Sequence, residues 1–137
     1  MVARRQLPHG RADLPAEQPV AARAAAAKGI PGLAVSAGFD DAAAYAEAAK
    51  LAVGWIEQHR AALLDGSMDT TPATVTNINV PVCSAGEVRG LVEVPVATAA
   101  PTGFDPVDCS ASVGSTKPAD DVAAIAGGWA SISDIGV

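Results

Sequence analysis

The clearest pattern in the chain is an apolar repeat every three or four residues between residues 40 and 64. This spacing predicts a long helix that buries one face. Asp40 or Asp41 can cap its start, and the segment Asp65-Gly66-Ser67 ends it. The residues expected on the buried face are Ala44, Ala48, Leu51, Ala52, Trp55, Ile56 and Leu63.

Shorter segments on both sides of this helix predict an alternating helix and strand order. Residues 20–28 are alanine-rich and predict a helix, whereas residues 30–36 are apolar on both faces, as in a buried parallel strand. Residues 74–80 alternate and are rich in β-branched side chains, residues 88–97 are extended, and residues 129–135 alternate again. A short helix is expected from Asp120 to Ala126. The order predicts an α/β fold with a sheet that is parallel in its core, followed by an irregular extension.

Composition and charge exclude two classes of partner. The hydrophobic fraction is 50%, but no apolar run reaches the 18 residues typical of a membrane span, so no membrane partner is expected. The net charge is −6, because residues 1–30 carry five bases and two acids (+3) while residues 31–137 carry four bases and thirteen acids (−9). An acidic body argues against a nucleic-acid partner.

The first 19 residues differ from the rest of the chain. They contain three prolines and no sustained apolar period, so we expect residues 1–19 to be a disordered leader and residues 20–137 to form the domain. No apolar stretch of 7–15 residues follows the basic start, so no signal peptide is recognised and the expected location is cytoplasmic.

Three polar residues at strand ends are candidates for binding. Asn77 and Asn79 end one predicted strand and Ser36 ends another, and open α/β sheets place their ligands at such ends. These side chains could contact a substrate or could bond neighbouring loops, and the sequence leaves both readings open. No catalytic residue is identified, since His9 and His59 lack partners in the sequence.

The adjacent carboxylates at residues 40–41 and 120–121 each precede a predicted helix, which favours capping over metal binding. The two cysteines, Cys83 and Cys109, are too few for a zinc site without further ligands. They could form a disulfide if the chain returns in a hairpin-like manner, or remain thiols in a reducing compartment.

Three ordered segments resemble the SurE (survival protein E) family of nucleotidases. They are AARAAAAKGIPGLAVS at residues 21–36, NINVP at residues 77–81 and DDVAAIAGGWASISDI at residues 120–135. The segment from Val82 onward, with the later Cys109, further resembles a branch of the family that has two cysteines in this region. The resemblance covers about residues 20–137.

The resemblance implies a partial Rossmann-like parallel sheet with an irregular β-hairpin C-terminal arm, and a homo-oligomer. It implies hydrolysis of nucleoside 5′- or 3′-monophosphates with a divalent cation, Mg²⁺ or Mn²⁺. Relatives of full length could be exported.

This sequence departs from the family in one respect that matters for chemistry. The paired aspartates that hold the family's metal, and the later serine and asparagine ligands, have no counterpart in the sequence. We therefore expect this chain to bind no metal and to be inactive by itself. The alternative is a non-catalytic remnant, from a truncated or frameshifted reading frame, or an oligomerisation and interaction module.

Overall fold

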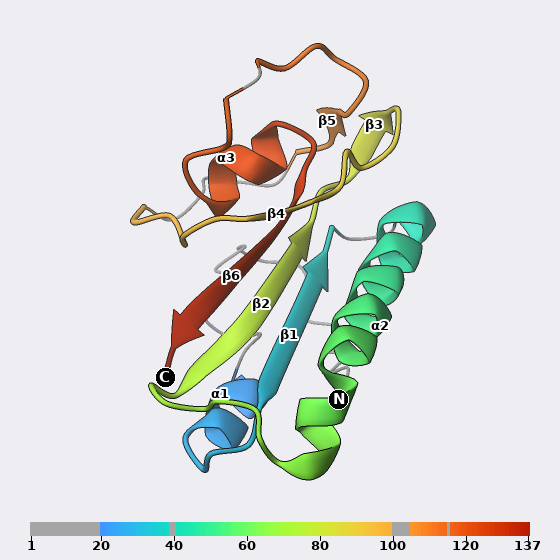
Figure 1. The fold of residues 1–137 in the computed structure, drawn as a ribbon. Helices are drawn as coiled ribbons and strands as arrows, with labels where there is room; N and C mark the ends of the chain where they lie inside the picture. Colours follow the sequence, from blue (N-terminus) through green and yellow to red (C-terminus); the bar gives the residue numbers. More distant parts are fainter. Residues whose placement is uncertain (1–19, 39–40, 100–104, 115) are drawn as a thin grey trace, which may run out of the picture.

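The computed structural model describes residues 20–38, 41–99, 105–114 and 116–137 (Figure 1). The expected leader at residues 1–19 lies outside the described residues. The helices are α1 (Val20–Ala26), α2 (Ala42–Asp65) and α3 (Asp121–Ala126). The strands are β1 (Gly32–Ala37), β2 (Thr74–Val80), β3 (Cys83–Ala85), β4 (Leu91–Glu93), β5 (Val107–Asp108) and β6 (Ala130–Gly136).

The main sheet has four strands in the order β1-β2-β6-β4. β1 is parallel to β2 and β4 is parallel to β6, whereas β6 runs antiparallel to β2. The predicted fold class is confirmed: this is a mixed α/β structure with a mostly parallel, partial Rossmann-like sheet.

The arm that follows β2 is irregular, but its strands do not form the expected hairpin. β3 pairs with β5 in parallel, and β4 pairs with β6 in parallel. The physical reason is that a two-residue turn can join only antiparallel neighbours, whereas long connections separate each of these pairs and let the second strand enter in the same direction.

Helix α2 covers one face of β1 and β2 (Figure 1). The Asp41 side chain caps it by accepting a hydrogen bond from the Ala44 amide at 2.7 Å, and Gly66 ends it with a φ of 73°. The core beneath it contains Ala48, Trp55, Ile78, Val80 and Ala130. One prediction was wrong: Ile56 is 46% exposed, because it lies one residue beyond Trp55 and is turned about 100° away from the sheet.

Several boundaries also differ from those predicted. α1 ends at Ala26 rather than residue 28, and the turn after it uses Gly29 at a φ of 73°. Ile30 is exposed and β1 begins at Gly32. Only Leu91–Glu93 of the extended run 88–97 pairs as a strand, since Gly90 and Pro95 flank these residues.

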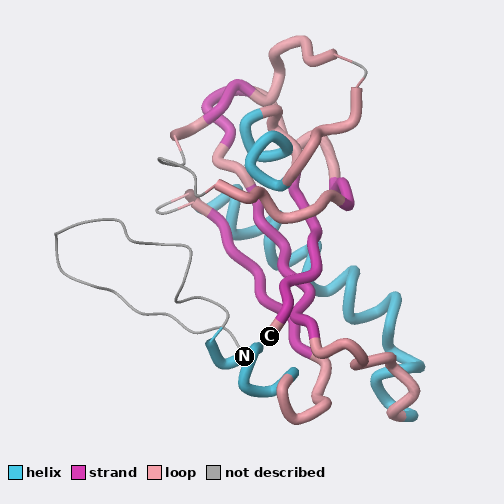
Figure 2. The backbone as a smooth tube through the Cα atoms, turned by 90° about the vertical axis from the view of Figure 1, so that its left-hand side faces the viewer, coloured by secondary structure: helices cyan, strands magenta, loops and turns pink. Residues whose placement is uncertain are grey.

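Helix α3, β3 and β5 gather beyond one end of the main sheet (Figure 2). A disulfide joins Cys83 to Cys109, with Cα atoms 5.5 Å apart. Gly128 lies against it, because an added Cβ there would be 3.1 Å from the Cys109 Sγ. Arg89 bonds the carbonyl of Gly127 at 2.8 Å and also bonds that of Ala111. These contacts attach the arm to the start of β6.

Candidate functional site

The face of the sheet turned away from α2 carries a group of polar side chains, which we call the polar face. It contains Ser36, Asn77, Asn79, Ser131 and Ser133. Strand residues alternate between the two faces, and Ile78 and Val80 point to α2, so Asn77 and Asn79 point the other way. Register places Ser36 beside Asn79, Asn79 beside Ser131, and Asn77 beside Ser133.

Ser36 and Asn79 are in direct contact. The Ser36 hydroxyl donates a hydrogen bond to the Asn79 Oδ1 at 2.5 Å, so the two strand-end residues proposed from the sequence interact across β1 and β2. Both are half-buried. With its Oδ1 accepting, Asn79 still has two amide N–H donors, and Ser36 still has an acceptor oxygen. The pair can therefore offer both donors and acceptors to a polar ligand.

Two serines of β6 on the polar face were not predicted as part of a site. Ser133 is 4% exposed and donates to the Val94 carbonyl at 2.7 Å. Ser131 is fully buried, and its hydroxyl has no hydrogen-bond partner in the described part of the chain. The alternation of serine with apolar residues is a sequence signal that Ser131 and Ser133 share one face of this strand, although it does not show which strand lies beside them.

The carboxylates near the helix starts are used for capping. Asp41 accepts from Ala44, and Asp120 accepts from the Ala123 amide at 2.8 Å. Asp121 accepts from the Ala97 amide at 2.7 Å, which ties the extended run to α3. Asp40 and His9 lie outside the described residues. Within the described ranges, no three His, Cys, Asp or Glu side chains form a group that could hold a metal ion.

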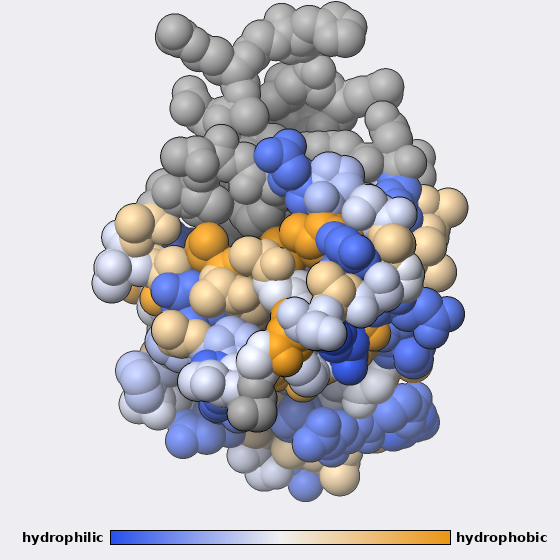
Figure 3. Space-filling view, turned by 90° about the horizontal axis from the view of Figure 1, so that it is seen from above, coloured by the Kyte–Doolittle hydropathy of each residue, from blue (hydrophilic) through white to orange (hydrophobic). Residues whose placement is uncertain are grey.

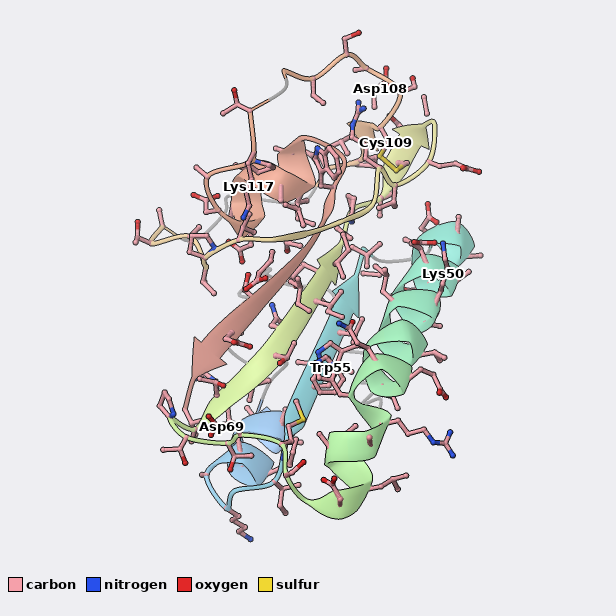
Figure 4. All side chains as sticks on the ribbon, in the orientation of Figure 1. Lys50, Trp55, Asp69, Asp108, Cys109 and Lys117 are labelled. Carbon is pink, nitrogen blue, oxygen red and sulfur yellow. A yellow bond between two sulfur atoms is a disulfide. The ribbon has the colours of Figure 1, made fainter. Side chains whose placement is uncertain are left out.

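An open groove of about 880 Å³ runs along the sheet between α2 and the strands β4 and β6. Among the side chains that line it are Trp55, His59, Asp69, Glu93, Lys117 and Asp134. In Figure 4, Asp69 and Lys117 lie near opposite ends of the main sheet. Three carboxylates against one lysine make this groove unfavourable for a phosphate group.

His59 packs on Trp55 in this groove, with ring centroids 4.4 Å apart. Its Nδ1 lies 2.8 Å from the Trp55 carbonyl oxygen, so Nδ1 carries the proton and donates to that carbonyl. Among the described contacts of this ring there is no carboxylate of the kind that orients the histidine of a catalytic triad. The imidazole is held in place by Trp55 of its own helix.

Two aspartates have perturbed titration, and both are on the surface. Hydrogen bonds from the side chain and then the backbone of Ser67 hold the pKa of Asp65 below its ordinary value. Ser110 lowers the pKa of Asp108 in the same way, through its hydroxyl at 2.6 Å and its amide at 2.9 Å. These are local turns beside a helix end and beside the disulfide, so they stabilise loops and do not mark a reaction centre.

The end of the molecule that carries α3 and the disulfide has a mixed surface. In Figure 3 the apolar side chains of the described residues lie in separate groups between polar ones. None of the described helices is long and apolar enough to cross a membrane.

Comparison with known families gives a match over the first part of the described chain. A family model described as survival protein SurE matches residues 20–101, which is more than half of the 137-residue chain. The match includes α1, β1, α2 and β2 and therefore both Ser36 and Asn79. No curated protein matches the chain.

Proposed function

The chain belongs to the survival protein SurE family, and from that premise we propose that it binds a nucleoside monophosphate at the polar face without hydrolysing it by itself. The family is one of phosphomonoester hydrolases that use a divalent cation. The observation that carries the proposal is the contact between Ser36 and Asn79 at the carboxyl end of two parallel strands. Ligands of open α/β sheets bind at that end.

The Ser36 and Asn79 side chains can form hydrogen bonds with the uncharged ribose of a nucleotide or with its phosphate oxygens. The Asn79 amide can donate to a phosphate or ribose oxygen, while the Ser36 oxygen can accept from a ribose hydroxyl. Asn77 lies two residues earlier on the same face and can extend the contact. The acidic groove on the opposite side of the sheet offers no comparable place for an anion.

The described residues do not fit the divalent cation that the family uses. Mg²⁺ needs near-octahedral oxygen ligands, usually including one or two carboxylates. Asp41 and Asp120 are bonded to backbone amides at the starts of α2 and α3, on different elements, and no three-ligand group accompanies them in the part of the chain that the structure describes. We therefore derive no reaction step through a metal.

We further propose that the family unit extends past the matched residues to residue 137. The match ends at residue 101, but β6 lies between β2 and β4 in the sheet. Without β6, β4 would have no partner in the main sheet and one edge of β2 would be bare. The segment at residues 120–135 is therefore part of the same folding unit.

Isothermal titration of the purified chain with a nucleoside monophosphate, the matching nucleoside and inorganic phosphate tests binding. We expect the monophosphate to bind more tightly than either part, and Asn79→Ala and Ser36→Ala to weaken binding at least tenfold. Thr76→Ala is the matched control, because Thr76 lies on the same strand, faces the other side and bonds Asp134 at 3.1 Å. Equal affinities of the Asn79 variant and the control would overturn the proposed site.

The second part of the proposal is that the chain does not hydrolyse the nucleotide by itself. A measurement of phosphate released from the same nucleotide, with Mg²⁺ or Mn²⁺ and with a chelator, tests it. We expect no release above that of a heat-denatured sample. Turnover that the chelator abolishes would contradict the proposal and would direct attention to acidic residues outside the described ranges.

A second candidate function is an interaction module, and one observation favours it. Helix α2 exposes large apolar side chains on the side that does not pack against the sheet, among them Val53 at 58% and Ile56 at 46%. Failure of nucleotide binding together with association that depends on protein concentration would favour this function over the first.

A further inference from the structure

The disulfide between Cys83 and Cys109 is the covalent link between the two short strands of the arm. β3 and β5 pair over a short, irregular register, and the amides of Val107 and Cys109 donate to the carbonyls of Val82 and Ala85 at 2.9 Å. A two-stranded ladder is marginally stable even when it is longer than this one. The disulfide therefore holds β5 against β3, at an end of the molecule away from the core under α2 (Figure 4).

The turn that leads into β6 rests directly on this disulfide. Gly128 has a φ of 77°, and a Cβ added to it would lie 3.1 Å from both the Cα and the Sγ of Cys109. In the loop after β3, a Cβ added to Gly86 would lie 2.7 Å from the Ser110 amide nitrogen. Glycine thus allows the backbone to pass close to residues 109–110 at two places, and Cys109 is only 3% exposed.

Arg89 connects the same turn to the segment after the second cysteine. Its amide and its Nε donate to the carbonyls of Gly128 and Gly127 at 3.0 and 2.8 Å. Its guanidinium also donates to the carbonyl of Ala111, two residues after Cys109. A movement of the segment around Cys109 is therefore passed to the turn through these hydrogen bonds as well as through direct packing.

The start of β6 belongs to the polar face. The Ala130 amide donates to the Gly90 carbonyl at 2.9 Å, which begins the pairing of β6 with β4. The next residue, Ser131, lies beside Asn79 in the sheet. Contiguous contacts thus lead from Cys109 through the turn to Asn79, and continuous contacts of this kind can carry coupling between two sites.

We propose that the disulfide is a redox switch for the polar face: the oxidised protein binds a nucleoside monophosphate, and reduction frees the Gly127–Gly128 turn and weakens that binding. This regulation presupposes the proposed function. Two separate thiols need a wider spacing than two bonded sulfurs, and Gly128 is in close contact with Cys109, so the turn must shift when the bond breaks. β1, α2 and β2 stay folded in both states, because the core that the structure describes beneath α2 contains neither cysteine.

The reduction is a two-electron exchange with a dithiol, either a small molecule or a protein that carries one. A thiolate of the dithiol attacks the Sγ of Cys83, because Cys83 is half-buried whereas Cys109 is buried. A mixed disulfide forms, the bond between the two cysteines breaks, and Cys109 leaves as a thiolate that takes up a proton. The second thiol of the reductant then loses its proton and attacks the reductant sulfur of the mixed disulfide. Cys83 is released and protonated, so the protein gains two electrons and two protons while the dithiol becomes a disulfide.

The coupling must be reciprocal. If reduction weakens nucleotide affinity by a given factor, bound nucleotide shifts the equilibrium between thiols and disulfide toward the disulfide by the same factor. A saturating concentration of adenosine 5′-monophosphate should therefore make the protein about tenfold harder to reduce in a dithiothreitol redox buffer.

Titration calorimetry and NMR on the full chain, before and after treatment with dithiothreitol, test the proposal. We expect the Kd for adenosine 5′-monophosphate to rise about tenfold on reduction and to recover on reoxidation. Backbone chemical shifts should change at residues 83–90, 105–111 and 127–131, whereas those of α2 and β1 should stay the same. Alkylation followed by mass spectrometry counts the free thiols, and circular dichroism shows that the reduced chain is folded.

Three variants separate the switch from other effects of the reductant. The double variant Cys83→Ser with Cys109→Ser should bind as weakly as the reduced protein and should not respond to dithiothreitol. Gly128→Ala should weaken binding with the disulfide intact, because its Cβ would press against the Cys109 Sγ. Gly114→Ala is the matched control, since Gly114 lies in the same arm and an added Cβ there would have no described atom within 4 Å. It should bind and respond to reduction like the wild type.

Three results would each overturn the switch: equal nucleotide affinity in the oxidised and reduced states, chemical-shift changes confined to the two cysteines, or loss of all folded structure on reduction. A chain that binds the nucleotide in neither state would overturn the proposed function instead. The chemical shifts of residues 127–131 would then still show whether reduction frees the turn.

Discussion

Removing the buried hydroxyl of Ser131 should stabilise the protein, although the residue is fully buried. Its Oγ has no partner among the described residues, and the residue belongs to β6, a strand that α3 packs against. A buried polar group without a hydrogen bond costs about 1–3 kcal/mol. In Ser131→Ala this cost disappears.

The substitution also leaves a small space. At about 24 cal/mol per Å³, a cavity of roughly 15 Å³, the size of one oxygen atom, costs about 0.4 kcal/mol. The net effect is a gain of about 1 kcal/mol in the free energy of unfolding. For a chain of this length that corresponds to a rise of about 3–6 °C in Tm.

Urea unfolding followed by Trp fluorescence, at one fixed protein concentration, measures this change. The concentration must be fixed because any association of the folded state shifts the apparent stability. Ser133→Ala is the matched control, since Ser133 lies two residues away on the same face but donates to the Val94 carbonyl at 2.7 Å. That variant should lose about 1–2 kcal/mol, because a buried carbonyl loses its donor.

The two variants should therefore move in opposite directions. A loss of 1 kcal/mol or more in Ser131→Ala would refute the reasoning, because it would mean that the hydroxyl is hydrogen-bonded in solution. Equal losses in both variants would have the same meaning.

Other expected results follow from separate features. Replacing both Cys83 and Cys109 with serine should lower the free energy of unfolding by about 3–4 kcal/mol under oxidising conditions, and reduction of the wild type should reproduce that loss; equal stability of the oxidised and reduced protein would contradict it. Asp41→Ala should cost about 1 kcal/mol through loss of the α2 cap, whereas Asp41→Asn should retain most of it, as measured by urea unfolding. The pKa values of Asp65 and Asp108 are lowered in the folded state, so their contribution to stability is present above their ordinary pKa near 3.8 and is lost as pH falls through the lower folded values. Ser110→Ala should return the pKa of Asp108 toward its ordinary value in an NMR titration without moving that of Asp65, and an unchanged Asp108 would show that Ser110 is not the cause.

The elements that the sequence predicted well are those with strong local signals. The long helix was found because its apolar period continues over six turns and Asp41 and Gly66 mark its ends. β1 and β2 were found from apolar and β-branched runs bounded by proline and glycine. Their parallel pairing followed from the helix between them.

The parts that the sequence did not predict depend on distant residues. The parallel pairing of β3 with β5 and the short length of β4 are set by contacts across more than twenty residues, for which the local pattern carries no information. Ile56 was assigned to the core because apolar residues lie on more than one side of this helix. Periodicity alone does not show which of these sides packs against the sheet. In the site, Ser36 and Asn79 were identified as strand ends, but Ser131 could not be placed beside Asn79 without knowing that β6 returns antiparallel to β2.

The position of β6 has a consequence for how the chain acquires its structure during synthesis. β6 lies in the interior of the sheet, between β2 and β4, yet it is made of residues 130–136 and begins fifty residues after the end of β2. β1, α2 and β2 can associate as soon as they leave the ribosome, but β4 must wait for β6, because no other described strand of the main sheet pairs with it. Until then the free edge of β2 is exposed to other nascent chains. Long-range pairings of this kind fold slowly and expose aggregation-prone edges, so yield in cells should depend on translation speed and chaperone supply more than the final stability suggests.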